Sequence, residues 1–104
     1  MTNLRLEHGD NVLSAYLAGE IDHHSAGLLR SKIDSAVQIA TPDILIMDFN
    51  GVTFMDSSGV GLILGRHKLI SILGGKLIVQ GVPMHVHKLL NLAGIKCEYE
   101  ENKK

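Results

Sequence analysis

A carboxylate and two hydroxyls stand together near the middle of the chain, in the tetrapeptide Asp56-Ser57-Ser58-Gly59. A long apolar stretch follows directly, so these side chains are expected at the N-terminus of a helix. A helix N-terminus carries unpaired N–H groups and a partial positive charge, and it therefore accepts an anion. A serine at that place can cap the helix, with Ser58 as the N-cap, or it can carry a phosphate with little harm to the fold. The residue types alone leave both possibilities open.

Catalysis by these serines is disfavoured by the residues around them. A nucleophilic serine needs a base and an oxyanion site, and the G-x-S-x-G turn that supplies them in many hydrolases needs a glycine two residues before the serine. Neither serine has one. The glycines at 59, 61 and 65 miss the dinucleotide-binding spacing by one residue, and no Gly-Lys pair completes a phosphate-binding loop. We attribute Gly65 to close packing of the helix on a sheet, and we expect no cofactor and no enzymatic activity.

A second polar group, Asp22-His23-His24, is made of residue types that bind metals. Adjacent residues at the start of a helix point about 100° apart, so both histidines rarely reach one metal ion. No further cluster of ligands stands at a suitable spacing. Helix capping and a polar recognition surface are therefore favoured, and a metal-dependent phosphoesterase using these three residues is the alternative.

Hydrophobic periodicity predicts the elements that would position both groups. Strands are predicted at 4–7 and 12–18, joined by a turn at 8–11. The predicted helices are one capped by Asp22 or Ser25 and ended by Thr41-Pro42, one over 59–73, and a short one from Gly81-Val82-Pro83 to a C-cap at Gly94. The remaining strands are 44–47, expected to be buried on both faces, 76–80, and a last edge strand over 95–99.

This β-β-α-β-α-β-α-β order is typical of an α/β protein with a mixed, mostly parallel sheet. The length predicts a single domain over residues 1–104, with a polar tail at 100–104. If the strands that precede Asp22 and Asp56 are parallel, both loops lie at the same end of the sheet and form one surface. Arg66, His67 and Lys68 are expected at the surface, with Arg66 available to an acidic partner.

Composition excludes several function classes. The net charge is −1, so a general nucleic-acid binder is not indicated. A single cysteine, Cys97, rules out an internal disulfide and a cysteine-rich zinc site. The N-terminal residues lack the apolar core of a signal peptide, and no apolar run is long enough to span a membrane. We therefore expect a cytoplasmic protein that contacts neither membrane nor nucleic acid.

Two segments resemble a known family in register with each other. They are Leu17-Ala18-Gly19-Glu20-Ile21-Asp22-His23-His24 and Phe54-Met55-Asp56-Ser57-Ser58-Gly59-Val60-Gly61-Leu62-Ile63-Leu64-Gly65-Arg66. Both resemble the anti-sigma factor antagonists, which are bacterial STAS-domain proteins, and most closely the sporulation type. The predicted order of elements agrees with this family over nearly the entire chain.

The resemblance implies a partner-switching function. The unphosphorylated protein would bind an anti-sigma factor that is also a serine kinase, and this binding would free a sigma factor. The kinase would then phosphorylate the second serine of the motif, Ser58, with Ser57 as the alternative, and a PP2C-type phosphatase would reverse the reaction. The expected partner-binding residues are Asp22, His23, His24, Asp56, Ser57, Ser58, Gly59, Gly61 and Arg66.

Family members usually continue past the last strand into another helix, whereas this sequence ends at Lys104. We therefore expect that helix to be missing. A STAS module that serves as a non-enzymatic scaffold is a further alternative to the partner-switching function.

Overall fold

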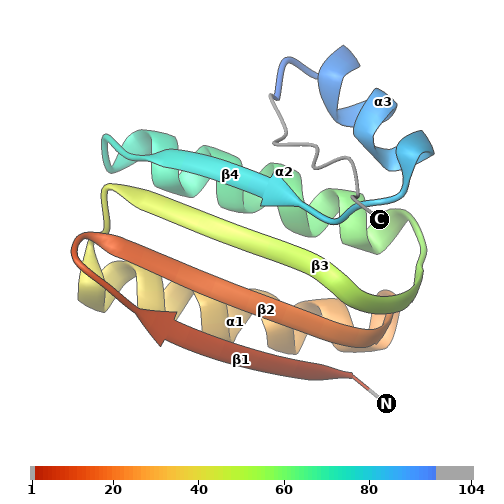
Figure 1. Cartoon of the computed structure of the whole chain (residues 1–104), viewed down its shortest axis with the longest axis horizontal. Coiled ribbons are helices and arrows are strands. Elements are labelled where there is room, and N and C mark those ends of the chain that lie inside the picture. The colour runs from red at the N-terminus through yellow and green to blue at the C-terminus, as the bar shows by residue number, and fades with distance from the viewer. Residues whose placement is uncertain (1, 96–104) are drawn as a thin grey trace.

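The computed structural model describes residues 2–95. Within them the chain forms four strands and three helices in the order β1, β2, α1, β3, α2, β4, α3 (Figure 1). Their bounds are β1 Asn3–His8, β2 Val12–Ile21, α1 His23–Ala40, β3 Ile44–Met55, α2 Ser57–Ile72, β4 Lys76–Gln80 and α3 Met84–Leu92. The predicted order is confirmed up to α3. Of the predicted last strand, only Ile95 lies within the described residues, and the polar tail lies outside them.

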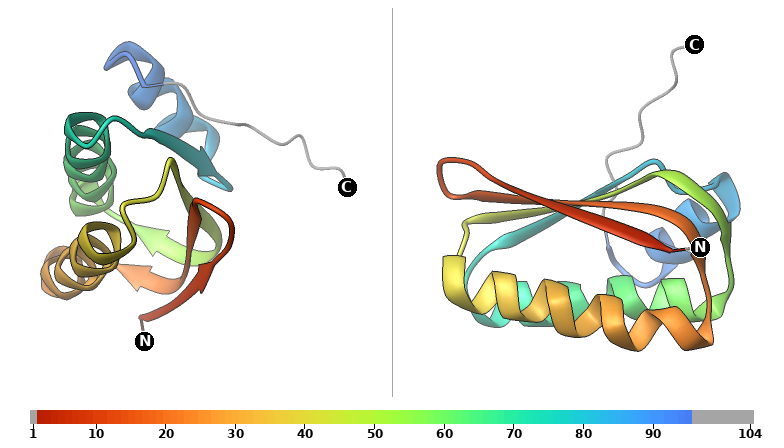
Figure 2. Two further views of the ribbon diagram at one scale, coloured as in Figure 1. Left: turned by 90° about the vertical axis from the view of Figure 1, so that its left-hand side faces the viewer. Right: turned by 90° about the horizontal axis from the view of Figure 1, so that it is seen from below.

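The strands form one mixed sheet in the order β1-β2-β3-β4. β1 and β2 are antiparallel, whereas β2 pairs with β3 and β3 with β4 in parallel. The helices α1 and α2 connect the parallel strands and lie side by side on one face of the sheet (Figure 2). α3 lies beyond β4, near the end of the sheet at which β3 finishes (Figure 1).

The core lies between the sheet and the two long helices. Alternate strand residues such as Leu13, Leu45 and Val79 are fully buried there. Ile33 of α1 and Ile63 of α2 are also fully buried and belong to the same cluster. α1 follows directly after β2, and α2 follows directly after β3. The strand that leads into each helix therefore fixes where the helix starts.

The other face of the sheet carries half-buried residues, so the expectation that strand 44–47 is buried on both faces is wrong. Ile44 and Ile46 are only partly buried, while their neighbours Leu45 and Met47 are fully buried. The two long helices, α1 and α2, both lie on the opposite face of the sheet (Figure 2), which explains this difference. Asp48 is also on the less covered face; its carboxylate accepts hydrogen bonds from Gln80 Nε2 at 2.7 Å and from the Asn50 amide N–H at 2.8 Å.

Strands β2 and β3 are both longer than the sequence pattern predicts. They continue to Ile21 and Met55, with two shifts of register along the way. Gly19 has a left-handed φ of 85°, and Gly51 lies so close to Ala18 that a larger residue would crowd it. These irregular positions hide the alternation of polar and apolar residues that would reveal the strands in the sequence.

Candidate functional site

The site is built around the start of α2, where Asp56 is the N-cap residue. Its Oδ1 accepts a hydrogen bond from the Ser58 amide N–H at 2.8 Å, and its backbone oxygen accepts one from the Gly59 amide at 3.0 Å. The prediction that Ser58 caps the helix is therefore wrong. Asp56 performs that task with a carboxylate, which also complements the positive end of the helix dipole. The serine hydroxyls are not needed for capping.

The start of α1 is capped in the same way. Asp22 Oδ1 accepts hydrogen bonds from the amides of His24 and Ser25, each at 3.0 Å, and Ser25 Oγ accepts one from the Asp22 amide. This reciprocal pair is a capping box, and it confirms Asp22 as the predicted N-cap. The hydrogen bond from the Ser25 amide lowers the pKa of Asp22 below its ordinary value; partial burial opposes this shift, and the His24 amide adds to it.

The two helix starts are neighbours, as the sequence predicts. Ile21 pairs with Met55 in the parallel register of β2 and β3, and the Asp56 amide donates a hydrogen bond to the Ile21 carbonyl oxygen at 3.2 Å. Asp22 and Asp56 therefore follow directly from two adjacent strand ends. The two polar groups thus begin side by side at the carboxyl end of the parallel strands.

The two serines point to different sides of α2. Residues 57, 60, 61 and 64 recur at helical spacing, and all four line one pocket. Ser58 is rotated by about 100° from Ser57, toward the side of Leu62 and Arg66. Arg66 in turn contacts α1. Ser57 is exposed, whereas Ser58 is half-buried.

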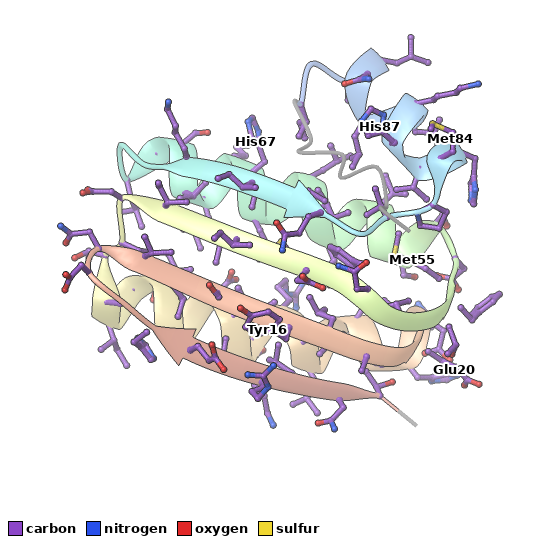
Figure 3. The ribbon with its side chains drawn as sticks, viewed as in Figure 1. Tyr16, Glu20, Met55, His67, Met84 and His87 are labelled. Atoms are coloured by element: carbon purple, nitrogen blue, oxygen red, sulfur yellow. The ribbon has the colours of Figure 1, made fainter. Side chains whose placement is uncertain are left out.

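The pocket lies between α2 and α3 and has a volume of about 540 Å³. Its lining is mainly apolar and comes from the end of β3, the first two turns of α2 and the first six residues of α3. The lining residues are Met55, Asp56, Ser57, Val60, Gly61, Leu64, His85, Val86 and Leu89. Figure 3 shows Met55 at the end of β3, with Met84 nearby at the start of α3.

α3 contributes the part of the site that the sequence did not indicate. The sequence pattern around His85 and Leu89 indicates a helix but no binding site. His85 is exposed, and it also lines a second, smaller pocket with Phe54 and Pro83. The spacing of 85 and 89 is that of one helix face, but only the position of α3 beside α2 reveals what that face borders.

Arg66 is buried, so its predicted surface position is wrong. Its side chain is 7% exposed, and its Nε lies 2.7 Å from Asp34 Oδ1 of α1, an ion-pair contact without the alignment of a hydrogen bond. Burial lowers the pKa of Arg66, and the Asp34 carboxylate opposes that shift. The guanidinium therefore joins α2 to α1 and is not available to an acidic partner.

The glycines of α2 also differ from expectation. A side chain at Gly59 would collide with Met55, so this glycine does allow close packing. At Gly61 and Gly65 an added Cβ would meet no heavy atom within 4 Å, so the close packing expected at Gly65 is wrong. Both positions face open space.

His23 and His24 are exposed at the start of α1, and their rings meet edge to face with centroids 5.5 Å apart. Within residues 2–95, no three His, Cys, Asp or Glu side chains gather closely enough to hold a metal ion. Among the described helices, none is long and apolar enough to cross a membrane.

Comparison with known proteins places this arrangement in a family. A model of the STAS domain matches residues 3–101. The chain belongs to the STAS domain family. This STAS domain is 40% identical over 92 residues to the anti-sigma F factor antagonist of Paenibacillus polymyxa, a match that covers 88% of this chain and 79% of the relative. It is 33% identical over 95 residues to the anti-sigma-B factor antagonist of Bacillus subtilis, covering 90% and 84%.

Solved structures agree with these relatives. The unphosphorylated form of the anti-sigma factor antagonist SpoIIAA superposes on the STAS domain with a TM-score of 0.79 and 31% identity, covering 92% of this chain and 87% of SpoIIAA. The phosphorylated Bacillus SpoIIAA gives a TM-score of 0.80 and 29% identity, covering 96% and 93%. The resemblance seen in the sequence is confirmed, as is the α/β fold.

Proposed function

We propose that this STAS domain is an anti-sigma factor antagonist that acts in the cytoplasm by partner switching. Its unphosphorylated form binds an anti-sigma factor with serine kinase activity, and the sigma factor is released. Phosphorylation in the Asp56–Ser58 turn weakens the complex, and a PP2C-type phosphatase restores it. The names of the curated relatives support binding to an anti-sigma factor. The existence of unphosphorylated and phosphorylated SpoIIAA structures supports a switch by phosphorylation.

One observation on this chain supports the proposal. Two serines stand at the start of α2, and the neighbouring start of α1 adds a second polar loop to the same surface. Because Asp56 caps α2, a hydroxyl can be modified without removing the cap. The surface can thus gain charge while the helix keeps its N-terminal hydrogen bonds.

The choice between the two serines is part of the proposal. The family resemblance points to Ser58, with Ser57 as the alternative. Exposure supports Ser57 instead, because a kinase must reach the hydroxyl and Ser58 is half-buried. We propose Ser57 as the main acceptor and Ser58 as the second candidate.

A phosphate acts mainly on the interface. It adds a charge of about −1.5 to −2 beside Asp56. The helix N-terminus offsets this repulsion by about 0.3–1 kcal/mol, so the fold is retained. A charge buried without a partner in an interface costs about 2–5 kcal/mol, which lowers affinity by about tens- to thousands-fold.

The test is to mix the chain with the anti-sigma F factor of Paenibacillus polymyxa and ATP, and to map the phosphate by mass spectrometry. We expect phosphate on Ser57 in the wild type. The Ser57→Ala variant should resist phosphorylation and bind constitutively, whereas Ser57→Asp should bind weakly. Ser71→Ala alters an exposed serine near the other end of α2 and serves as the matched control.

The outcomes separate the alternatives. Phosphate lost only in Ser58→Ala would make Ser58 the acceptor. Phosphate on neither serine would remove the proposed switch. Binding to the anti-sigma factor without release of its sigma factor would favour the scaffold function.

A further inference from the structure

We propose that the pocket between α2 and α3 receives an apolar side chain of the anti-sigma factor, and that phosphate on Ser57 blocks its entry. This inference rests on the proposed function and names the surface through which it works. The pocket borders the Asp56–Ser58 turn directly, since Asp56 and Ser57 form part of its lining. Any partner that covers the turn therefore also meets the pocket.

The lining fits an aliphatic guest. Five of the nine lining residues are apolar, and two of these, Leu64 and Leu89, remain 38% and 49% exposed. Filling an apolar hollow removes apolar surface from water, which favours an aliphatic guest. A volume of about 540 Å³ lies within the range of roughly 300–1,000 Å³ of small-molecule pockets, so it has room for an aliphatic side chain.

Acidic side chains at this end of the sheet favour a basic partner, while Lys88 of α3 is an exposed cation next to the lining residue Leu89. Asp22 and Asp56 stand at the two helix starts, and Glu20 is exposed at the same end of the sheet (Figure 3). None of the residues that line the pocket is Lys or Arg. A partner segment with an apolar residue beside a basic one complements both features, whereas an acidic segment would be repelled.

The position of Ser57 couples the pocket to phosphorylation. Ser57, Val60, Gly61 and Leu64 share the face of α2 that borders the pocket, and Ser58 lies on another side. A phosphate on Ser57 would stand at the rim, with about two negative charges that hold water. An apolar side chain entering the pocket would have to strip that water, so phosphate and guest exclude each other.

Gly61 offers a way to fill the pocket without disturbing the fold. It lines the pocket, yet an added Cβ would meet nothing within 4 Å. A leucine there would occupy the guest's space and would also be a better helix former than glycine. An added Cβ at Gly65 would likewise meet nothing within 4 Å; this glycine lies one turn further along α2 and does not line the pocket. Gly65→Leu is therefore the matched control for Gly61→Leu.

The experiment measures binding of each variant to the purified anti-sigma F factor of Paenibacillus polymyxa by calorimetry. Gly61→Leu should weaken binding at least tenfold, about 1.4 kcal/mol. Gly65→Leu should stay within about threefold of wild type, or about 0.7 kcal/mol. Thermal unfolding of all three proteins checks that each is folded. Equal binding by Gly61→Leu and wild type would overturn the pocket proposal alone, whereas no binding by wild type would overturn the proposed function with it.

Two further measurements distinguish blocking from distortion. In spectra of methyl-labelled methionine, the signal of Met55 should shift on binding, while that of Met47, fully buried in the core, should not. The losses caused by Gly61→Leu and Ser57→Asp should not add, because both exclude the same guest. Additive losses would contradict the shared mechanism. A wild type that dimerises, with a monomeric Gly61→Leu, would show that a second copy of the chain fills the pocket instead.

Discussion

Asp22 is a single residue on which the pH dependence of the site can be tested. Hydrogen bonds from the Ser25 and His24 amides lower its pKa from the ordinary 3.8, although partial burial opposes them. A carboxylate whose pKa is lower in the folded state stabilises the protein fully above its unfolded pKa. That contribution is lost as the pH falls through the lower folded value.

We expect this loss to be absent in Asp22→Asn, whose side chain does not titrate. The difference in unfolding free energy between wild type and variant should be constant from neutral pH to about 4 and should shrink below it. Urea unfolding at a series of pH values measures this difference. A difference that grows on acidification would show that the sign of the pKa shift is wrong.

At the scale of the elements, the ion pair between Asp34 and Arg66 holds α1 against α2. Its two ends are unequally buried, because the Arg66 side chain is 7% exposed and that of Asp34 is 30% exposed. Removing one partner of a buried pair leaves the other charge without compensation. The cost should therefore depend on which partner is removed.

We expect Asp34→Asn to cost about 3 kcal/mol, the low end for breaking a buried pair, because it leaves the buried guanidinium unpaired. Arg66→Met should cost less, about 1 kcal/mol, since water can still reach the Asp34 carboxylate. Denaturant unfolding of both single variants and the double variant checks this. The double variant should be more stable than the sum of the single losses predicts. Equal losses would contradict the asymmetry.

The glycines of α2 allow a second test at this scale. Gly61→Ala should stabilise the protein by about 0.5–1 kcal/mol, because alanine is the better helix former and meets no atom there. Gly59→Ala should lose that gain, since its methyl group forces Met55 out of position, at a cost of about 0.5–1.5 kcal/mol. Melting temperatures of the two variants provide the comparison. Equal stabilisation would mean that Met55 moves freely.

The sequence predicts features that depend on local contacts, and it fails for features that depend on how the elements pack. The cap at Asp22 and the end of α1 near Thr41 depend on local hydrogen bonds and backbone preference, so residue types indicate them. The burial of Arg66 and the partial exposure of Ile46 depend on which face each helix covers. The parallel direction of the two strands, which the order of elements indicates, predicts that Asp22 and Asp56 are neighbours. No pattern in the sequence predicts that α3 lies beside Ser57.

At the scale of the whole molecule, the proposed switch changes a surface and leaves the fold intact. The three parallel strands and the two long helices enclose one core, and the serines lie at its rim. We expect the phosphorylated chain to keep its circular dichroism spectrum and to melt within a few degrees of the unmodified form, since about 1 kcal/mol corresponds to about 4–8 °C in a domain of this size. A phosphorylated chain that unfolds near room temperature would show that the switch works by loss of structure.

α3 should be the helix that opens most readily by local unfolding. It has nine residues, no side chain caps its start, and only Val86 and Leu90 are buried within it. Short, sparsely packed elements open at a lower free energy than the core. The amides of α3 should therefore exchange with deuterium before those of α1 and α2. If a partner fills the space between α2 and α3, binding should slow exchange most in α3, so its amides would report occupancy in an experiment that needs no substitution.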